Sequence, residues 1–178
     1  MHLTDRQLNR ATLARQLLLE RERLDAVDAI RRILAVQAQS PPSPYLALWA
    51  RLDGFDASHL DAAFADQKVV KASLMRITLH AVHADDYPAM YAAMAPSLRG
   101  ARLHDRRFLD AGLTKEDAET LLPQFLAFLD QPRSAAEVEA HVAELRGQPE
   151  PWLWWAYRTF APMFRAPTGG PWTFDGST

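Results

Sequence analysis

The chain has 178 residues, a formal net charge of −2 and 48% hydrophobic residues, a composition typical of a soluble globular protein with a sizeable core. It has no cysteine, no run of eighteen apolar residues and no apolar signal-peptide core, so disulfides and thiolate metal sites are excluded and no membrane partner is expected. A cytoplasmic setting is therefore the expectation.

The first half of the chain predicts helices followed by a β-hairpin. Thr4 and Gln7 form a capping box at the start of the first helix, and Asp25 begins the second. The β-branched stretch "KVVKASLMRITLHAVH" is typical of two paired strands. The predicted elements are helices at 5–22, from 25, at 41–52, at 56–66 and at 84–99, and a hairpin at 68–83.

The second half repeats this order. Thr114 and Ser134 are the predicted N-caps of two helices, the aromatic helix "EPWLWWAYRTFAPMF" follows, and "FRAPTGGPWTFDG" predicts a hairpin that turns at Gly169-Gly170. Three helices followed by a two-stranded hairpin is the winged-helix pattern. We therefore expect a mainly α fold with short β-hairpins, organised as tandem winged-helix (helix-turn-helix) domains. The predicted parts are 1–98, a first winged helix with extra N- and C-terminal helices, 99–112, a basic linker, and 113–178, a second winged helix truncated at its C-terminal side.

Two glutamines, Gln37 and Gln39, stand one residue apart directly before the elbow "SPPSP". Ser40 precedes Pro41, which disfavours helical geometry, and in an extended segment side chains two residues apart face the same side. The two amides then converge, and they can hold a water molecule without titrating. The alternative is that they cap the helix end and satisfy the backbone of the elbow, and the residue types alone favour this alternative.

The flanking sequence adds a resemblance. "LARQLLLERERLDAVDAIRRILAVQAQSPPSPYLALWARL" and "VVKASLMRITLHAVHADD" resemble the winged-helix DNA glycosylases of the AlkZ/YcaQ type, and the resemblance extends over essentially all of the chain. The family's catalytic signature is Gln, a small or apolar residue, and then Gln or Asp. It stands here as Gln37-Ala38-Gln39, the double-glutamine form of the branch that acts on alkylated purines and crosslinks. The family usually carries a third winged helix and a C-terminal β-barrel-like part, and the resemblance finds neither within these 178 residues.

The resemblance implies a bacterial DNA repair enzyme. Its expected activity is that of a monofunctional DNA glycosylase, which hydrolyses the N-glycosidic bond of N7-alkylated purines, with interstrand crosslinks as further substrates. Gln37 and Gln39 are the expected catalytic residues, without a cofactor or a metal. The expected partner is double-stranded DNA carrying alkylated purines, in the nucleoid of the cytoplasm, and no obligate protein partner is implied.

A neutral amide pair suits such a substrate. N7-alkylation gives the purine a positive charge, so the base leaves without protonation by an acid. A positioned water and oriented dipoles are then what stabilise the cationic sugar. Without a carboxylate, the site is expected to be weak against unmodified bases, whose departure needs protonation.

Two groups of residues are the candidate DNA contacts. Arg76, Thr78 and His80 alternate, so on a strand they share one face, where Arg76 would reach a phosphate; a solvated strand face is the alternative. Arginines also crowd the linker, where a phosphate-binding loop and a solvated loop are equally favoured. These linker arginines are Arg99, Arg102, Arg106 and Arg107.

The rival function is that of a non-catalytic winged-helix DNA-binding protein or regulator, and a protein-interaction scaffold is a third. A regulator that reads sequence needs a polar recognition helix, whereas "SPYLALWARL" and "EPWLWWAYRTF" are mostly apolar. The aromatic residues of the second segment are interpreted as core. His80 and His83 would face opposite sides of a strand and lack further ligands, so no metal site is expected.

Overall fold

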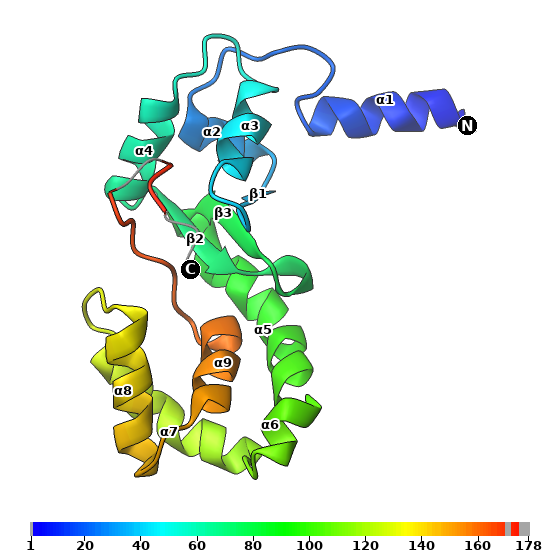
Figure 1. Ribbon diagram of the computed structural model, residues 1–178. Helices are drawn as coiled ribbons and strands as arrows, with labels where there is room; N and C mark the ends of the chain where they lie inside the picture. Colours follow the sequence, from blue (N-terminus) through cyan, green and yellow to red (C-terminus); the bar gives the residue numbers. More distant parts are fainter. Residues whose placement is uncertain (1, 170–171, 175–178) are drawn as a thin grey trace. The chain divides into compact units, whose positions relative to one another are not determined.

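The computed structural model describes residues 2–169 and 172–174, and it shows a mainly α-helical chain with one small antiparallel sheet (Figure 1). The described residues divide into two compact units. The first unit contains the residues up to Met90 and those from Phe164 onward, and the second contains Tyr91–Met163. No helix among the described residues is both long and apolar enough to cross a membrane.

The first helix, α1 (Asp5–Arg15), is shorter than the predicted 5–22. Leu17 adopts a φ of 56° and is 2% exposed, so the chain leaves the helix after Arg15 and buries that leucine. Arg51 donates its Nε–H to the carbonyl oxygen of Gln16 at 2.8 Å, which satisfies one of the acceptors at the helix end. Burial of one leucine therefore overrides a helical pattern that continues in the sequence.

Three strands form the sheet, which is part of the first unit. They are β1 (Ala35–Gln37), β2 (Val69–Ser73) and β3 (Leu79–His83), in the spatial order β1-β3-β2, with both pairings antiparallel. The predicted hairpin is the β2–β3 pair. The pairing of β1 with β3 is a feature that the sequence pattern did not predict. Leu34, with a φ of 74°, ends the preceding helix and directs the chain into this edge strand.

The core of the first unit lies between one face of the sheet and the three helices α2 (Ala26–Arg32), α3 (Ser43–Trp49) and α4 (Ala57–Ala65). Val36 and Ala81 are opposite one another on that face and are buried in this core. Each fully buried large aliphatic or aromatic side chain contributes about 1.5–3 kcal/mol. On the other face of the sheet Val70 and Val82 are also buried, whereas Gln37 at the end of β1 is exposed.

The described residues from Phe164 onward return to the first unit. The backbone N–H of Arg165 donates to the carbonyl oxygen of Lys71 on β2 at 2.7 Å, and Phe174 packs edge-on against Phe64 of α4. The predicted hairpin turn at Gly169-Gly170 falls partly outside the described residues. The assignment of the chain to two winged helices stays a prediction.

The second unit consists of helices packed around an aromatic core. Tyr157 is buried, packs against Phe125 with ring centroids 4.5 Å apart and the rings tilted by 34°, and donates its hydroxyl hydrogen to the carbonyl oxygen of Ala118. A short 3₁₀ turn, η2 (Ala84–Asp86), precedes α5, whose first residues belong to the first unit. The helices of the second unit, including the part of α5 from Tyr91 onward, are α5 (Tyr87–Leu103), α6 (Arg106–Asp110), α7 (Lys115–Phe128), α8 (Ala135–Arg146) and α9 (Pro151–Phe160).

The stretch 99–112 is mostly helical, whereas sequence analysis expected a basic linker. The helix α5 continues to Leu103 and α6 follows after a break of two residues. Leu98, Leu103 and Phe108 are all buried, at 5% exposure or less. These three apolar residues fix the stretch against the rest of the unit, so their burial, rather than the charge of the arginines between them, decides its structure.

The predicted helix N-caps are confirmed. Each cap residue is extended, and its side-chain oxygen accepts a hydrogen bond from a backbone N–H of the first turn, which satisfies a donor that the helix leaves unpaired. The caps predicted from sequence and observed in the structure are Thr4, Thr114 and Ser134. Asp25 and Asp56 cap α2 and α4 in the same way.

Thr114→Ala is expected to lower the free energy of unfolding of the second unit by about 1 kcal/mol. The Thr114 hydroxyl accepts from the Asp117 N–H at 3.0 Å, and the Asp117 carboxylate accepts from the Thr114 N–H at 2.9 Å. Urea denaturation followed by tryptophan fluorescence measures the difference. Thr114→Ser keeps the hydroxyl and is the control; equal midpoints for the two variants would contradict the role of the cap.

Candidate functional site

The two glutamines lie at the end of the edge strand β1. Beyond Gln37 the chain stays extended, because the backbone N–H of Ala38 donates to the carbonyl oxygen of Leu79 at 2.8 Å. Val36 and Ala38 are buried at 5% and 1% exposure, whereas Gln37 and Gln39 are exposed. Since side chains alternate along an extended chain, both glutamine amides project from the same face of the sheet, away from the core.

The Gln39 side chain continues the hydrogen bonding of the sheet. Its Oε1 accepts a hydrogen bond from the backbone N–H of Leu79 at 3.1 Å. This is the backbone-satisfying role that sequence analysis held as the alternative for the pair. The bond leaves Gln39 one lone pair and its amide N–H groups, now in a fixed orientation. Within the described residues the Gln37 amide has no hydrogen-bond partner, so it is the more available of the two.

His80 lies directly opposite Gln37 in the β1–β3 register and is 4% exposed. Its Nδ1 is 3.0 Å from the carbonyl oxygen of Thr78. A carbonyl only accepts, so Nδ1 carries the hydrogen in this contact. Burial lowers the pKa of His80 below its ordinary value of 6.5, the Thr78 carbonyl opposes this, and the positive charge of Arg76 lowers the pKa further. The imidazole is therefore neutral at neutral pH.

Arg76 and Thr78 do not lie on a strand, and the expectation that they share a strand face with His80 is wrong. They lie in and after a 3₁₀ turn, η1 (Met75–Ile77), at the tip of the hairpin, where Arg76 and Ile77 have φ values of 56° and 62°. A hairpin needs a turn, and here the turn occupies residues whose alternation is typical of a strand. Arg76 is exposed and still lies close enough to His80 to act on its pKa.

The four arginines of the predicted basic linker are on the helices α5 and α6. Arg99 forms an ion pair with Glu119 at 2.9 Å. Arg102 donates to the Thr159 hydroxyl at 2.8 Å and lies 4.0 Å from the centre of the Trp155 ring. These two arginines are therefore held by contacts inside the second unit rather than extended into solvent.

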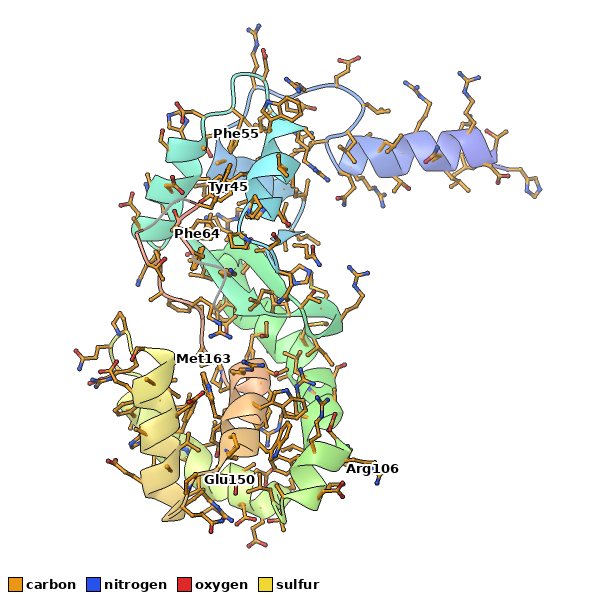
Figure 2. All side chains as sticks on the ribbon, viewed as in Figure 1. Tyr45, Phe55, Phe64, Arg106, Glu150 and Met163 are labelled. Carbon is orange, nitrogen blue, oxygen red and sulfur yellow. The ribbon has the colours of Figure 1, made fainter. Side chains whose placement is uncertain are left out.

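The other two arginines, Arg107 and Arg106, differ in how firmly they are held. Arg107 donates to both carboxylate oxygens of Asp105 at 2.9 Å, lies 4.5 Å from the centre of the Trp155 ring and, through those hydrogen bonds, lowers the pKa of Asp105 to about 2. The side chain of Arg106 is 92% exposed, and its nearest acid, Asp110, is 4.0 Å away; Figure 2 shows it projecting from α6. Arg106 is thus the most available of the four for a phosphate.

Trp152 and Trp155 complete a surface that sequence analysis missed, the arginine–tryptophan surface of Arg102, Arg107, Trp152 and Trp155. The aromatic segment was interpreted as core, and this is confirmed for its buried members on α9, such as Trp154 and Tyr157. The two other tryptophans are half-buried, meet edge-on at 5.8 Å and lie beneath guanidinium groups. Their spacing of three residues on the polar side of an amphipathic helix was the available signal.

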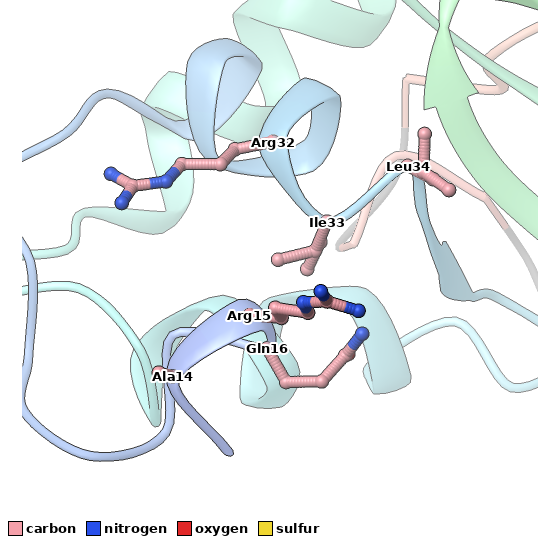
Figure 3. A pocket seen from close by; sticks show the side chains of 6 residues that line it. All are labelled: Ala14, Arg15, Gln16, Arg32, Ile33 and Leu34. Carbon is pink, nitrogen blue, oxygen red and sulfur yellow. The ribbon is translucent and has the colours of Figure 1, made fainter. Parts of the chain in front are cut away.

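A hollow of about 480 Å³ lies between the ends of α1 and α2 (Figure 3). Two arginines, one glutamine and aliphatic residues line it, so it offers neither an acid nor a base for hydrolysis. Its lining residues are Ala14, Arg15, Gln16, Arg32, Ile33 and Leu34. Among the described residues there is also no group of three side chains able to ligate a metal ion.

Comparison with known proteins decides the family. The family described as "DNA glycosylase AlkZ-like" matches residues 30–178. The chain belongs to the AlkZ-like DNA glycosylase family. This family match includes both glutamines, His80 and the arginine–tryptophan surface.

A solved structure shows the same fold as this AlkZ-like chain. It is the Streptomyces sahachiroi DNA glycosylase AlkZ, with a TM-score of 0.76 and 21% sequence identity over 91% of this chain. The match spans 45% of the Streptomyces protein, so the chain corresponds to less than half of that length. No curated protein sequence matches the chain significantly.

Proposed function

We propose that this AlkZ-like chain carries the catalytic site of a monofunctional DNA glycosylase that releases N7-alkylated purines from bacterial DNA in the cytoplasm. The observation that carries the proposal is the pair of exposed amides, Gln37 and Gln39, on one face of the sheet in a member of this family. The Gln37 amide holds the water, and the N–H groups and remaining lone pair of Gln39 orient it. Because both side chains are neutral, the site suits a leaving group that is already positively charged.

The position of Lys71, the lysine within the sheet, is the reason for proposing a monofunctional enzyme. A glycosylase that also cleaves the DNA strand needs an amine nucleophile at the sugar. Lys71 is opposite Ala81 in the sheet, on the face away from the glutamines, and is 1% exposed. Water is therefore the proposed nucleophile.

The exposure of the glutamines also favours crosslinked substrates. A base tethered to the opposite strand cannot be extruded freely into a closed pocket. Gln37 and Gln39 are exposed at the end of an edge strand, so a base that stays near the duplex can reach them. We include interstrand crosslinks among the proposed substrates for this reason.

A non-catalytic DNA-binding protein is the second candidate, and the hydrogen bond from Leu79 to Gln39 favours it because that amide then has a structural role. Release of 7-methylguanine from methylated duplex DNA distinguishes the two. A glycosylase releases the base and leaves an abasic site, whereas a binding module retains the DNA without releasing a base.

Arg106→Ala is expected to weaken DNA binding about equally for all sequences and to reduce the slope of log affinity against log salt by about one. Arg106 is the most exposed arginine of its group and has only a distant acid as a partner. Fluorescence anisotropy over a salt series measures the slope. Arg10→Ala, which removes an exposed arginine from α1, is the matched control. An equal change of the slope in both variants would contradict a specific phosphate contact by Arg106 on α6.

A further inference from the structure

The two glutamines lack a group that accepts a proton. An amide orients a water molecule, but it does not take up the hydrogen that the water must lose when its oxygen bonds to the sugar. A hydrolytic site built on Gln37 and Gln39 therefore has an incomplete set of functions. Among the residues that the structure describes, His80 is the other polar side chain that projects from this face of the sheet at the same end.

We propose that His80 is the general base of the reaction and accepts the proton of the water that Gln37 and Gln39 hold. This inference rests on the proposed function. The register carries it: Gln37 and His80 are directly opposite one another on antiparallel strands. Side chains so paired have Cβ atoms about 4.5–5.5 Å apart on the same face. A water bound to the Gln37 amide is thus within reach of the imidazole.

The hydrogen bond at Nδ1 fixes which nitrogen acts. Because Nδ1–H donates to the Thr78 carbonyl at 3.0 Å, the neutral ring carries its free lone pair on Nε2. Within the described residues Nε2 has no hydrogen-bond partner. It is not completely buried, so it keeps some contact with solvent. On its other flank His80 is opposite the small side chain of Ala72.

The reaction balances with this assignment. The bond from the sugar C1′ to the purine nitrogen breaks, and its electron pair neutralises the positive charge of the alkylated base. The water oxygen bonds to C1′, and one of its protons moves to Nε2 of His80. The products are an abasic sugar, a neutral alkylated purine and an imidazolium, which returns its proton to solvent.

The charges around His80 favour a base that is ready at neutral pH. Arg76 in the hairpin turn is the charged group that acts on it, and this charge opposes protonation. The cross-strand neighbours, Gln37 on β1 and Ala72 on β2, are uncharged. His83, on the same strand, is an odd number of residues away and faces the other side of the sheet. The pKa of His80 is below 6.5, so the base stays unprotonated at neutral pH.

The test is the pH dependence of single-turnover release of 7-methylguanine by the full-length protein. For the wild type, the rate constant is expected to fall about tenfold per pH unit once the pH is below the pKa of His80, and to be constant above it. In His80→Gln, which keeps a polar side chain but cannot accept a proton, the rate is expected to be about 100-fold lower and flat across the same range. His59→Gln, at an exposed position on α4, should retain the wild-type profile.

Three outcomes separate this inference from the proposed function. No release by the wild type at any pH overturns the proposed function itself. Release that depends on Gln37 but does not slow at any pH below 6.5 at which the protein stays folded overturns the role of His80. A His80→Gln variant with the wild-type rate and profile overturns it as well. Because the wild-type profile needs no variant, the inference remains testable even where the substitution disturbs folding.

Discussion

Gln37→Ala is expected to slow single-turnover release of 7-methylguanine by about 100- to 1,000-fold while DNA binding stays unchanged. The range is that of removing one preorganised polar group from a catalytic site. The Gln37 amide has no hydrogen-bond partner within the described residues and is exposed, so its loss leaves the sheet intact. Stability should therefore be unaffected, and the whole effect should fall on the rate.

Gln39→Ala is expected to differ from Gln37→Ala because it lowers the stability of the protein as well as the release rate. Its Oε1 accepts from the backbone N–H of Leu79, so the substitution also removes a hydrogen bond of the sheet, at about 1 kcal/mol. Release and thermal stability should both fall. Gln124→Ala, at an exposed glutamine of α7, is the matched control for both variants. Full activity of Gln37→Ala would make the pair structural and favour a DNA-binding module.

Much of the fold could be predicted from local sequence signals. The helix caps and the β2–β3 hairpin depend on residues within a few positions of one another, and the sequence displays them directly. The errors lie where distant residues decide. Leu17 ends α1 because it is buried in the core of the first unit, and β1 is a strand because it pairs with β3, more than forty residues later. Neither cause is visible in a local pattern.

In the candidate site, too, local features could be predicted from the sequence and features that depend on distant residues could not. The convergence of Gln37 and Gln39 could be predicted, because Pro41 disfavours a helix and an extended chain alternates. The environment of His80 could not be predicted, since it depends on the register with β1 and on the turn at Arg76. Likewise, Trp155 gains its place beneath two arginines from the packing of α6 and α5 against α9.

The charge of the leaving base is the property that should decide substrate choice. A duplex carrying 7-methylguanine is expected to lose its base about 1,000-fold faster than the same duplex carrying hypoxanthine, a difference within the range that a general acid supplies. Hypoxanthine is neutral and needs a proton in order to leave. Gln37, Gln39 and neutral His80, the polar groups on this face among the described residues of the sheet, have no acidic proton to give at neutral pH.

The measurement is single-turnover release from two oligonucleotides that differ only at the lesion, at equal saturation with enzyme. Equal binding of both duplexes confines the difference to the chemical step. Comparable release rates would show that an acid acts at the site and would contradict a neutral amide mechanism. The predicted selectivity follows from the absence of a proton donor beside Gln37 rather than from the shape of a pocket. It should therefore extend to other purines whose alkylation leaves a positive charge.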